Sequence, residues 1–257
     1  MKCFPIIYTR TYQNDFYRPF HVCPDFVNVD DIYPYIEQAF REYYINEGQF
    51  RRLILSNTEY CVFGNTCYIE KFCECDESIA DYTNDSNRRA IYGFFGFAVQ
   101  RTEENKIPCF QLEDCAKMFV KYMIPVWNRS FLETQIPDPV QLPEIAYTES
   151  VEPEVNQMVE NCHLFTNEGG LWEYLLWKAI CQKESLTYCS HIGDYSVLRQ
   201  MKFDYVVTSS EQISRLHYDV SKMLVEQKQQ DEAAEEPPPK KEETAFQRLF
   251  RTIFHHP

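Results

Sequence analysis

The sequence of 257 residues has only seven glycines, and none of them stands in a phosphate-binding pattern. Neither G-x-G-x-x-G nor G-x-x-x-x-G-K-[ST] is present, so the sequence predicts no dinucleotide site and no P-loop. The zinc-protease pattern H-E-x-x-H and the hydrolase pattern G-x-S-x-G are also missing. No local pattern therefore indicates a known enzyme class or a cofactor, and we expect no cofactor.

Long apolar runs are missing as well. No window approaches the roughly 20 apolar residues of a membrane span, and the opening MKCFPIIYTRTYQNDFY lacks the apolar core of a signal peptide. The eleven cysteines are odd in number and are scattered through apolar segments, which is typical of buried, reduced thiols rather than of a disulfide framework. We therefore expect a cytoplasmic protein.

Positive charge is in deficit. The net charge is -14, and residues 1–225 carry 20 Lys and Arg against 32 Asp and Glu, so the acidity belongs to the body of the chain. An acidic body repels phosphate groups, and we expect neither nucleic acid nor an anionic membrane surface as a partner. The aromatic content is 16%, which is typical of a packed aromatic core.

Residues 1–135 show alternating strand and helix patterns, which predict an α+β domain with a mainly antiparallel sheet. The expected strands are 5–10, 17–22, 52–57, 59–63, 66–72 and 90–100, and the expected helices run from 31 to 44 and from 112 to 124. Asn14 lies in a turn of an opening hairpin, and Gly64 with Asn65 is suited to a second hairpin turn. The order ββαβββα resembles that of profilin-like and longin-like modules, which are mostly interaction folds.

Three prolines mark residues 128–152 as a connector. Beyond it, residues 151–225 predict a smaller, helix-rich α/β subdomain. A buried helix is expected over 171–182, and strands over 186–192 and 204–208 with their relative orientation left open. Ser209 and Gln212 form a capping box that opens a last helix.

The C-terminal part has two segments of different composition. Residues 226–243 are rich in Gln, Glu, Lys and Ala and contain three consecutive prolines, which predicts a disordered linker. Residues 244–257 carry five large apolar residues at helical spacing, namely Phe246, Leu249, Phe250, Ile253 and Phe254. So short a helix is marginal alone in water and forms against another surface. That surface belongs to the body, to a partner protein, to a second copy or to a membrane.

Two groups of residues carry the types needed for chemistry. Cys61, Cys67, Cys73 and Cys75 cluster in sequence. Only Cys73 and Cys75 are close enough to act as paired zinc ligands, and the expected hairpin register places Cys61 and Cys67 on opposite faces, so we expect no metal site. Cys189 and His191 resemble a nucleophile and its base, but on a strand they lie about 6.5 Å apart along the chain, which is too far for a direct hydrogen bond.

The first hypothesis is therefore a cytosolic interaction protein with an adaptor or regulatory role, which recruits another protein through the C-terminal amphipathic helix. A homo-oligomer is the second form of this hypothesis, if the helix docks on another copy. The alternative is an enzyme of unrecognised class, and a cysteine-dependent hydrolase that uses Cys189 and His191 is the form of it that these residues suggest.

Overall fold

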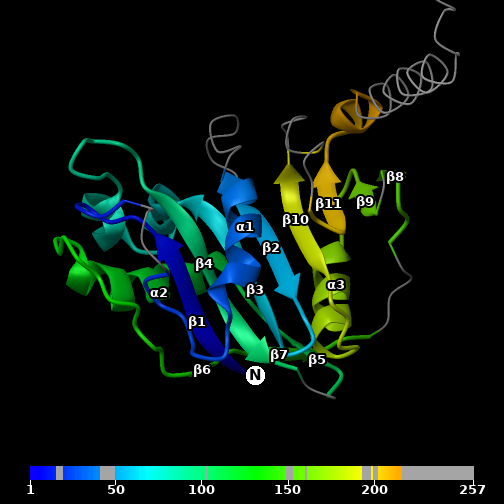
Figure 1. Ribbon diagram of the computed structural model, residues 1–257, viewed down its shortest axis with the longest axis horizontal. Helices are drawn as coiled ribbons and strands as arrows, with labels where there is room; N and C mark the ends of the chain where they lie inside the picture. Colours follow the sequence, from blue (N-terminus) through cyan, green and yellow to red (C-terminus); the bar gives the residue numbers. More distant parts are fainter. Residues whose placement is uncertain are drawn as a thin grey trace, which may run out of the picture. The chain divides into compact units, whose positions relative to one another are not determined.

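The core of the protein is a mixed sheet of nine strands, in the order β6-β1-β4-β3-β2-β10-β11-β9-β8 (Figure 1). The computed structural model describes residues 1–15, 20–40, 50–101, 104–148, 153–159, 161–192, 198 and 202–215. The strands are β1 (Lys2–Thr9), β2 (Arg51–Ser56), β3 (Tyr60–Tyr68), β4 (Tyr92–Gln100), β6 (Val140–Gln141), β8 (Gln157–Val159), β9 (Cys162–Phe165), β10 (Thr187–Ile192) and β11 (Tyr205–Thr208). Only the β10–β11 and β11–β9 ladders are parallel among the described pairs. The predicted α+β class with a mainly antiparallel sheet is confirmed.

Helices pack on both faces of this sheet. Helix α1 (Val29–Phe40) crosses one face, as the front of Figure 1 shows. The opposite face is covered by α2 (Leu112–Met118), α3 (Leu171–Ile180) and the short helical turns η1 (Ile69–Glu74), η2 (Glu77–Tyr82), η3 (Phe119–Met123) and η4 (Ile124–Val126). Alternation along the strands fills both faces with aromatic rings. Tyr8 stacks on Phe40 of α1 with ring centroids 5.9 Å apart, whereas Phe95 meets Phe72 of η1 at 4.9 Å on the other face.

Local periodicity located the helices well. Helix α1 begins at Val29, slightly earlier than predicted, and Pro34 consequently lies in its second turn. Helix α3 matches the buried helix expected over 171–182. Ser209 Oγ accepts a hydrogen bond from the backbone N–H of Gln212 at 3.2 Å, as a capping residue does. The remainder of that helix and residues 226–257 lie outside the described residues.

The predicted hairpin turn at Gly64 and Asn65 is wrong, because both residues lie in the middle of the continuous strand β3. Gly64 pairs with Leu53 on one side and with Gly96 on the other. A Cβ atom on Gly64 would lie 2.5 Å from Gly96 Cα and 2.8 Å from Cζ of Phe94. The glycine therefore makes room for an aromatic ring above the sheet instead of reversing the chain. It follows that Cys61 and Cys67 share one face of β3.

Within the described residues, the predicted opening hairpin is present as an isolated antiparallel bridge. Strand β1 pairs with β4 from Phe4 to Thr9 and with β6 at its start. Of the predicted second strand, 17–22, the structure describes residues 20–22, and there Val22 bridges to Ile7 of β1 and also to Gln135.

One sheet runs through both of the predicted parts, 1–135 and 151–225. Strand β10 pairs antiparallel with β2, and residues 1–216 form one compact unit. The predicted connector contributes β6, and it also contributes β7 (Glu144–Ala146), which forms a separate two-stranded sheet with β5 (Lys106–Pro108). The orientation of the two late strands, left open by their spacing, is parallel. The small β5–β7 sheet lies beside α3 and forms part of the candidate site.

Candidate functional site

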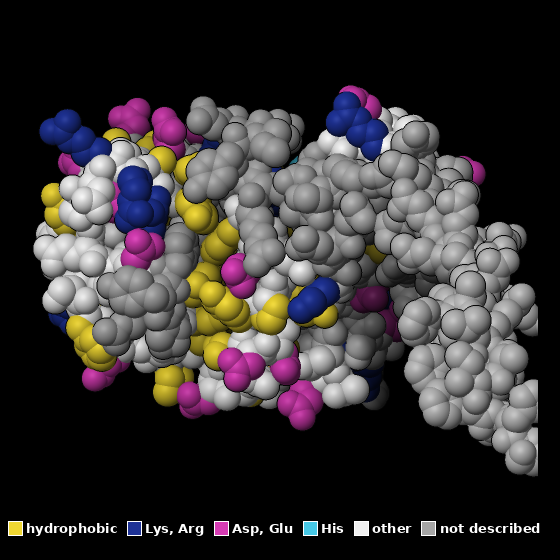
Figure 2. Space-filling model, turned by 45° about the horizontal axis from the view of Figure 1, so that its top comes forward, with side chains coloured by type: hydrophobic (Ala, Val, Ile, Leu, Met, Phe, Trp, Pro, Cys, Tyr) yellow, Lys and Arg dark blue, Asp and Glu magenta, His cyan; other side chains and the backbone are white. Residues whose placement is uncertain are grey.

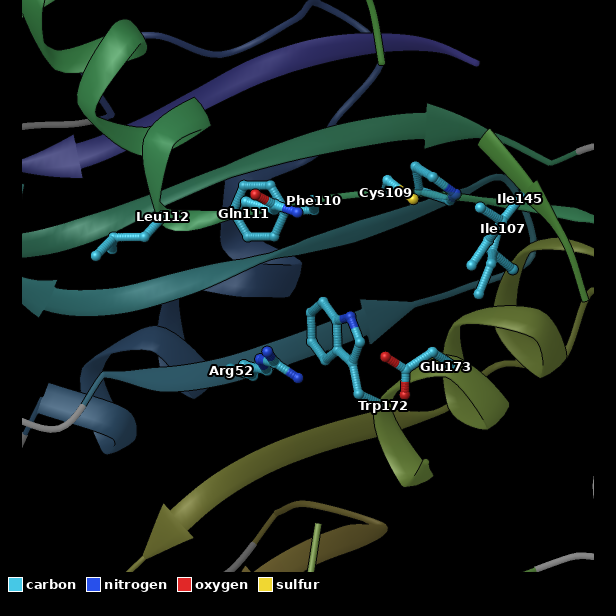
Figure 3. Close-up of a pocket in the computed structure, with 10 residues that line it drawn as sticks. Arg52, Ile107, Cys109, Phe110, Gln111, Leu112, Ile145, Trp172 and Glu173 are labelled. Carbon is cyan, nitrogen blue, oxygen red and sulfur yellow. The ribbon is translucent and has the colours of Figure 1, made fainter. Parts of the chain in front are cut away.

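A pocket of about 380 Å³ lies between the start of α3, the β5–β7 sheet and the segment that leads into α2 (Figure 3). This volume is near the lower end of the roughly 300–1,000 Å³ that is usual for ligand pockets. The lining residues are Arg52, Ile107, Pro108, Cys109, Phe110, Gln111, Leu112, Ile145, Trp172 and Glu173. Most of them are apolar, and the charged ones are Arg52 and Glu173.

The apolar side of the pocket rests on the main sheet. Ile107 and Ile145 are register partners in the β5–β7 sheet, and Ile145 is 47% exposed. Phe110 is half-buried and packs edge-on against Phe63 and Phe97, with centroids 5.7 Å from each. Because Phe63 and Phe97 are fixed in neighbouring strands, the position of the Phe110 ring is fixed by the core.

Arg52 of β2 is held in place by four contacts at the opposite end of the pocket. Its guanidinium lies 5.3 Å from the ring of Trp172 and 5.7 Å from that of Phe50, both within range of a cation–π interaction. Its Nη1 lies 3.6 Å from a carboxylate oxygen of Glu168, and its backbone N–H donates to Ser190 Oγ at 2.8 Å. The charge of Arg52 is therefore largely compensated within the protein.

Glu168 joins three side chains from two strands. The hydroxyl of Tyr188 donates to Oε1 of Glu168 at 2.8 Å, Arg52 approaches the same oxygen, and His191 Nε2 lies 3.8 Å from Oε2. Burial, followed by the charge of Glu168, raises the pKa of Tyr188 well above its ordinary value, so Tyr188 is a neutral donor at physiological pH. This network fixes the loop before α3 onto β2 and β10.

His191 reaches Glu168 because β10 is irregular at this point. The register of β10 against β11 shifts between Cys189 and Ile192, and His191 has a φ of 54°. A residue with a Cβ atom pays roughly 1–2 kcal/mol in this left-handed region. The carbonyl of His191 accepts a hydrogen bond from Nε of Arg51 at 3.1 Å, which stabilises the bulge.

The two residues predicted as a nucleophile and base have different environments. Cys189 is fully buried in the sheet, opposite Leu53, and its thiol donates to the carbonyl of Ser190 at 3.6 Å. The side chain of His191 is 37% exposed and faces Glu168. Arg52, Glu168 and the pocket were not predicted, because β2, the β5–β7 sheet and the start of α3 meet there only through tertiary packing.

The closely spaced cysteines of the sequence, Cys73 and Cys75, lie at the surface. Cys73 is half-buried and Cys75 is exposed. Burial, together with nearby Glu70 for Cys73 and Glu113 for Cys75, raises the pKa of both thiols. A raised pKa disfavours the thiolate that binds metal. Among the residues that the structure describes, no three His, Cys, Asp or Glu side chains are grouped so that they could hold a metal ion.

A second surface feature lies on the α1 side of the sheet. Figure 2 shows hydrophobic side chains gathered in a strip on this side, next to acidic ones. Tyr33 of α1 is 37% exposed, and Phe4, Phe26 and Tyr92 are half-buried. Within the described part of the chain, no helix has the length and apolar character needed to cross a membrane.

The predicted partner-binding residues Phe246, Leu249, Phe250, Ile253 and Phe254 lie outside the described residues. The pocket and the Glu168 network are thus the features of the described body that carry a functional hypothesis. Comparisons with protein-family models, with curated proteins and with solved structures found no match for this chain.

Proposed function

We propose that this chain is a cytoplasmic protein-interaction protein with an adaptor or regulatory role. The observation that carries this proposal is the pocket beside α3, which has mostly apolar walls, two charged lining residues and a volume suited to one or two large side chains. Pockets of this kind anchor the few partner side chains that dominate the binding energy of an interface.

The same geometry favours binding over cysteine chemistry. A nucleophilic thiol must be reachable by its substrate and be activated by a base. Cys189 is fully buried, whereas His191 is directed to Glu168. Glu168 itself is engaged by Tyr188, Arg52 and His191, as a structural carboxylate is. We therefore do not propose a hydrolase.

The C-terminal segment supplies a second binding element in this proposal. Residues 244–257 contain five large apolar residues at helical spacing in the sequence, and residues 226–243 precede them with the composition of a linker. Each of those side chains contributes roughly 1.5–3 kcal/mol when it is fully buried. A pocket on the body and a tethered docking segment together support the binding of two partners at once, which is the role of an adaptor.

Affinity capture with matched variants tests this proposal. The double variant Phe250→Asp, Ile253→Asp is expected to lose the partner proteins that bind the C-terminal segment. Deletion of residues 226–257 is expected to lose the same proteins. Neither change is expected to alter the urea midpoint of residues 1–225. Ile145→Glu, at the pocket wall, is expected to lose a different set of captured proteins. Ile136→Glu is the control, because Ile136 is 66% exposed and does not line the pocket.

The proposal fails if the captured proteins are the same for the wild type, the tail variant and Ile145→Glu. Loss of partners by Ile136→Glu to the same extent as by Ile145→Glu would also contradict a specific role for the pocket. Urea midpoints within experimental error of the wild type are the control for folding in each case.

A further inference from the structure

The two charged residues of the pocket differ in how they are satisfied. Arg52 has Glu168 as its ion-pair partner and Trp172 against its guanidinium. Glu173 is half-buried in the first turn of α3 and lines the pocket. Within the described ranges, no hydrogen bond or ion pair engages the carboxylate of Glu173. The unmatched charge of the pocket is therefore negative.

Cations close to Glu173 in the sequence or in the pocket wall are already paired elsewhere. Lys106, next to Ile107, lies 3.1 Å from Glu104 and 3.2 Å from Glu144. Lys178, one turn further along α3, lies 2.9 Å from Glu184. A carboxylate in the first turn of a helix also interacts favourably with the helix dipole, which explains why a glutamate is stable at position 173. The dipole does not supply a cation in the pocket.

Aromatic rings flank this carboxylate. Figure 3 shows the indole of Trp172 beside Glu173, with Phe110 across the pocket. Aromatic faces attract cations. Trp172 is 4% exposed and its ring already meets Arg52, so the half-buried Phe110 is the more accessible of the two rings. The apolar wall of Ile107 and Ile145 favours the hydrophobic part of the same ligand. The site thus combines a carboxylate, aromatic faces and an aliphatic wall.

We propose that the pocket binds an apolar segment of a partner protein that carries arginine or lysine. The cation lies next to Glu173 and the aromatic rings, and the neighbouring apolar side chains pack on Ile107, Phe110 and Ile145. This inference rests on the proposed interaction function and names the chemistry of the partner. The net charge of -14 supports it, because an acidic protein attracts a basic segment over a long range and raises its association rate.

Binding of two defined peptides to the full-length protein tests the charge preference. Both are fluorescently labelled, three-turn helical peptides with the same phenylalanine and leucine residues, and they differ only in having arginine or glutamate on the adjacent turns. We expect the basic peptide to bind at least about tenfold more tightly than the acidic one. Raising the salt concentration is expected to narrow this difference.

Variants of Glu173 locate the binding site. Glu173→Gln is nearly isosteric and is expected to weaken the basic peptide about five- to tenfold, whereas Glu173→Lys is expected to reverse the preference between the two peptides. The matched control is Glu113→Gln, because Glu113 lies in the first turn of α2, pairs with Lys117 at 3.3 Å and does not line the pocket. Its effect is expected to stay within about twofold.

Two results would overturn the inference. Tighter binding of the acidic peptide would mean that the pocket binds an anionic group through Arg52. Unchanged binding of the basic peptide in both Glu173 variants would mean that this peptide binds elsewhere on the acidic surface. If the peptides show either result while Ile145→Glu still loses its cellular partners, the interaction function stands and only the partner chemistry is wrong. If Ile145→Glu and the tail variant also leave the captured proteins unchanged, both proposals fall.

Discussion

Replacing Gly96 by alanine is the most direct test of how β3 and β4 pack. Gly96 faces Gly64 across the strand pair, and a Cβ atom on Gly96 would lie 2.2 Å from the carbonyl oxygen of Phe63 and 2.8 Å from Gly64 Cα. The same Cβ atom would lie 2.8 Å from Cζ of Phe94, which is fully buried. Two of the three clashes are with backbone atoms, so a change of rotamer cannot relieve them.

The size of the effect follows from what must move. The strands have to separate locally, which weakens flanking ladder hydrogen bonds worth about 0.5–1.5 kcal/mol each. The ring of Phe94 must also shift, and overpacking of a core residue typically costs about 1–3 kcal/mol. We therefore expect Gly96→Ala to lower the free energy of unfolding by about 3–5 kcal/mol, which is a large fraction of the roughly 5–15 kcal/mol usual for a domain.

Urea denaturation of Gly96→Ala beside two glycine controls measures this effect. At Gly169 a Cβ atom would come no closer than 3.4 Å to any neighbour, so Gly169→Ala is expected to change stability by less than about 0.5 kcal/mol. Gly170 has a φ of 74° and open space around it, so Gly170→Ala is expected to cost about 1–2 kcal/mol from backbone conformation alone. A loss below about 1 kcal/mol in Gly96→Ala would refute the proposed packing of the two strands.

Two further predictions concern buried polar groups. Tyr188→Phe removes the hydroxyl that donates to Glu168 and is expected to lower the free energy of unfolding by about 1.5–3 kcal/mol. The control Tyr12→Phe, at a 39% exposed position, is expected to change it by less than about 0.5 kcal/mol. Equal urea midpoints for the two variants would contradict this role of Tyr188. For Asp85, burial opposes the charged form, but the hydrogen bonds donated by Arg89 and the charge of Arg10 prevail and lower its pKa. A lowered pKa in the folded state stabilises the fold above the unfolded value of about 4, and this contribution is lost as the pH falls through the folded value. Asp85→Asn is therefore expected to reduce the loss of stability below about pH 4, measured by urea denaturation across pH, and an identical pH profile would show that Asp85 is not involved.

Sequence patterns predicted those parts of the fold that depend on neighbouring residues. The apolar spacing of α1 and α3 and the cap at Ser209 are local signals, and the structure contains both helices and the cap. Gly64 was misinterpreted because a Gly-Asn pair resembles a hairpin turn over a short window. Its true partner is Gly96, in a strand that is separated from β3 by the η1–η2 segment.

The candidate site was largely beyond prediction for the same reason. His191 was selected by its chemical type, yet its partner Glu168 lies in the loop before α3 and is brought near by tertiary packing. Arg52 and Trp172 come from β2 and α3, and no spacing in the sequence relates them. The composition did not indicate the site, since the aromatic content predicted a packed aromatic core and not a binding surface.

The pairing of β2 with β10 has a consequence for synthesis of the chain. The hydrogen bond between Arg52 and Ser190 joins residues 138 positions apart, so one edge of β2 has no sheet partner until β10 has been made. At a translation rate of roughly 5–20 residues per second, this edge of β2 remains unpaired for about 7–28 seconds. Because β2 is rich in leucine and isoleucine, a nascent or truncated chain that ends before β10 presents an apolar edge that invites aggregation. Expression of residues 1–135 alone is accordingly expected to yield insoluble protein.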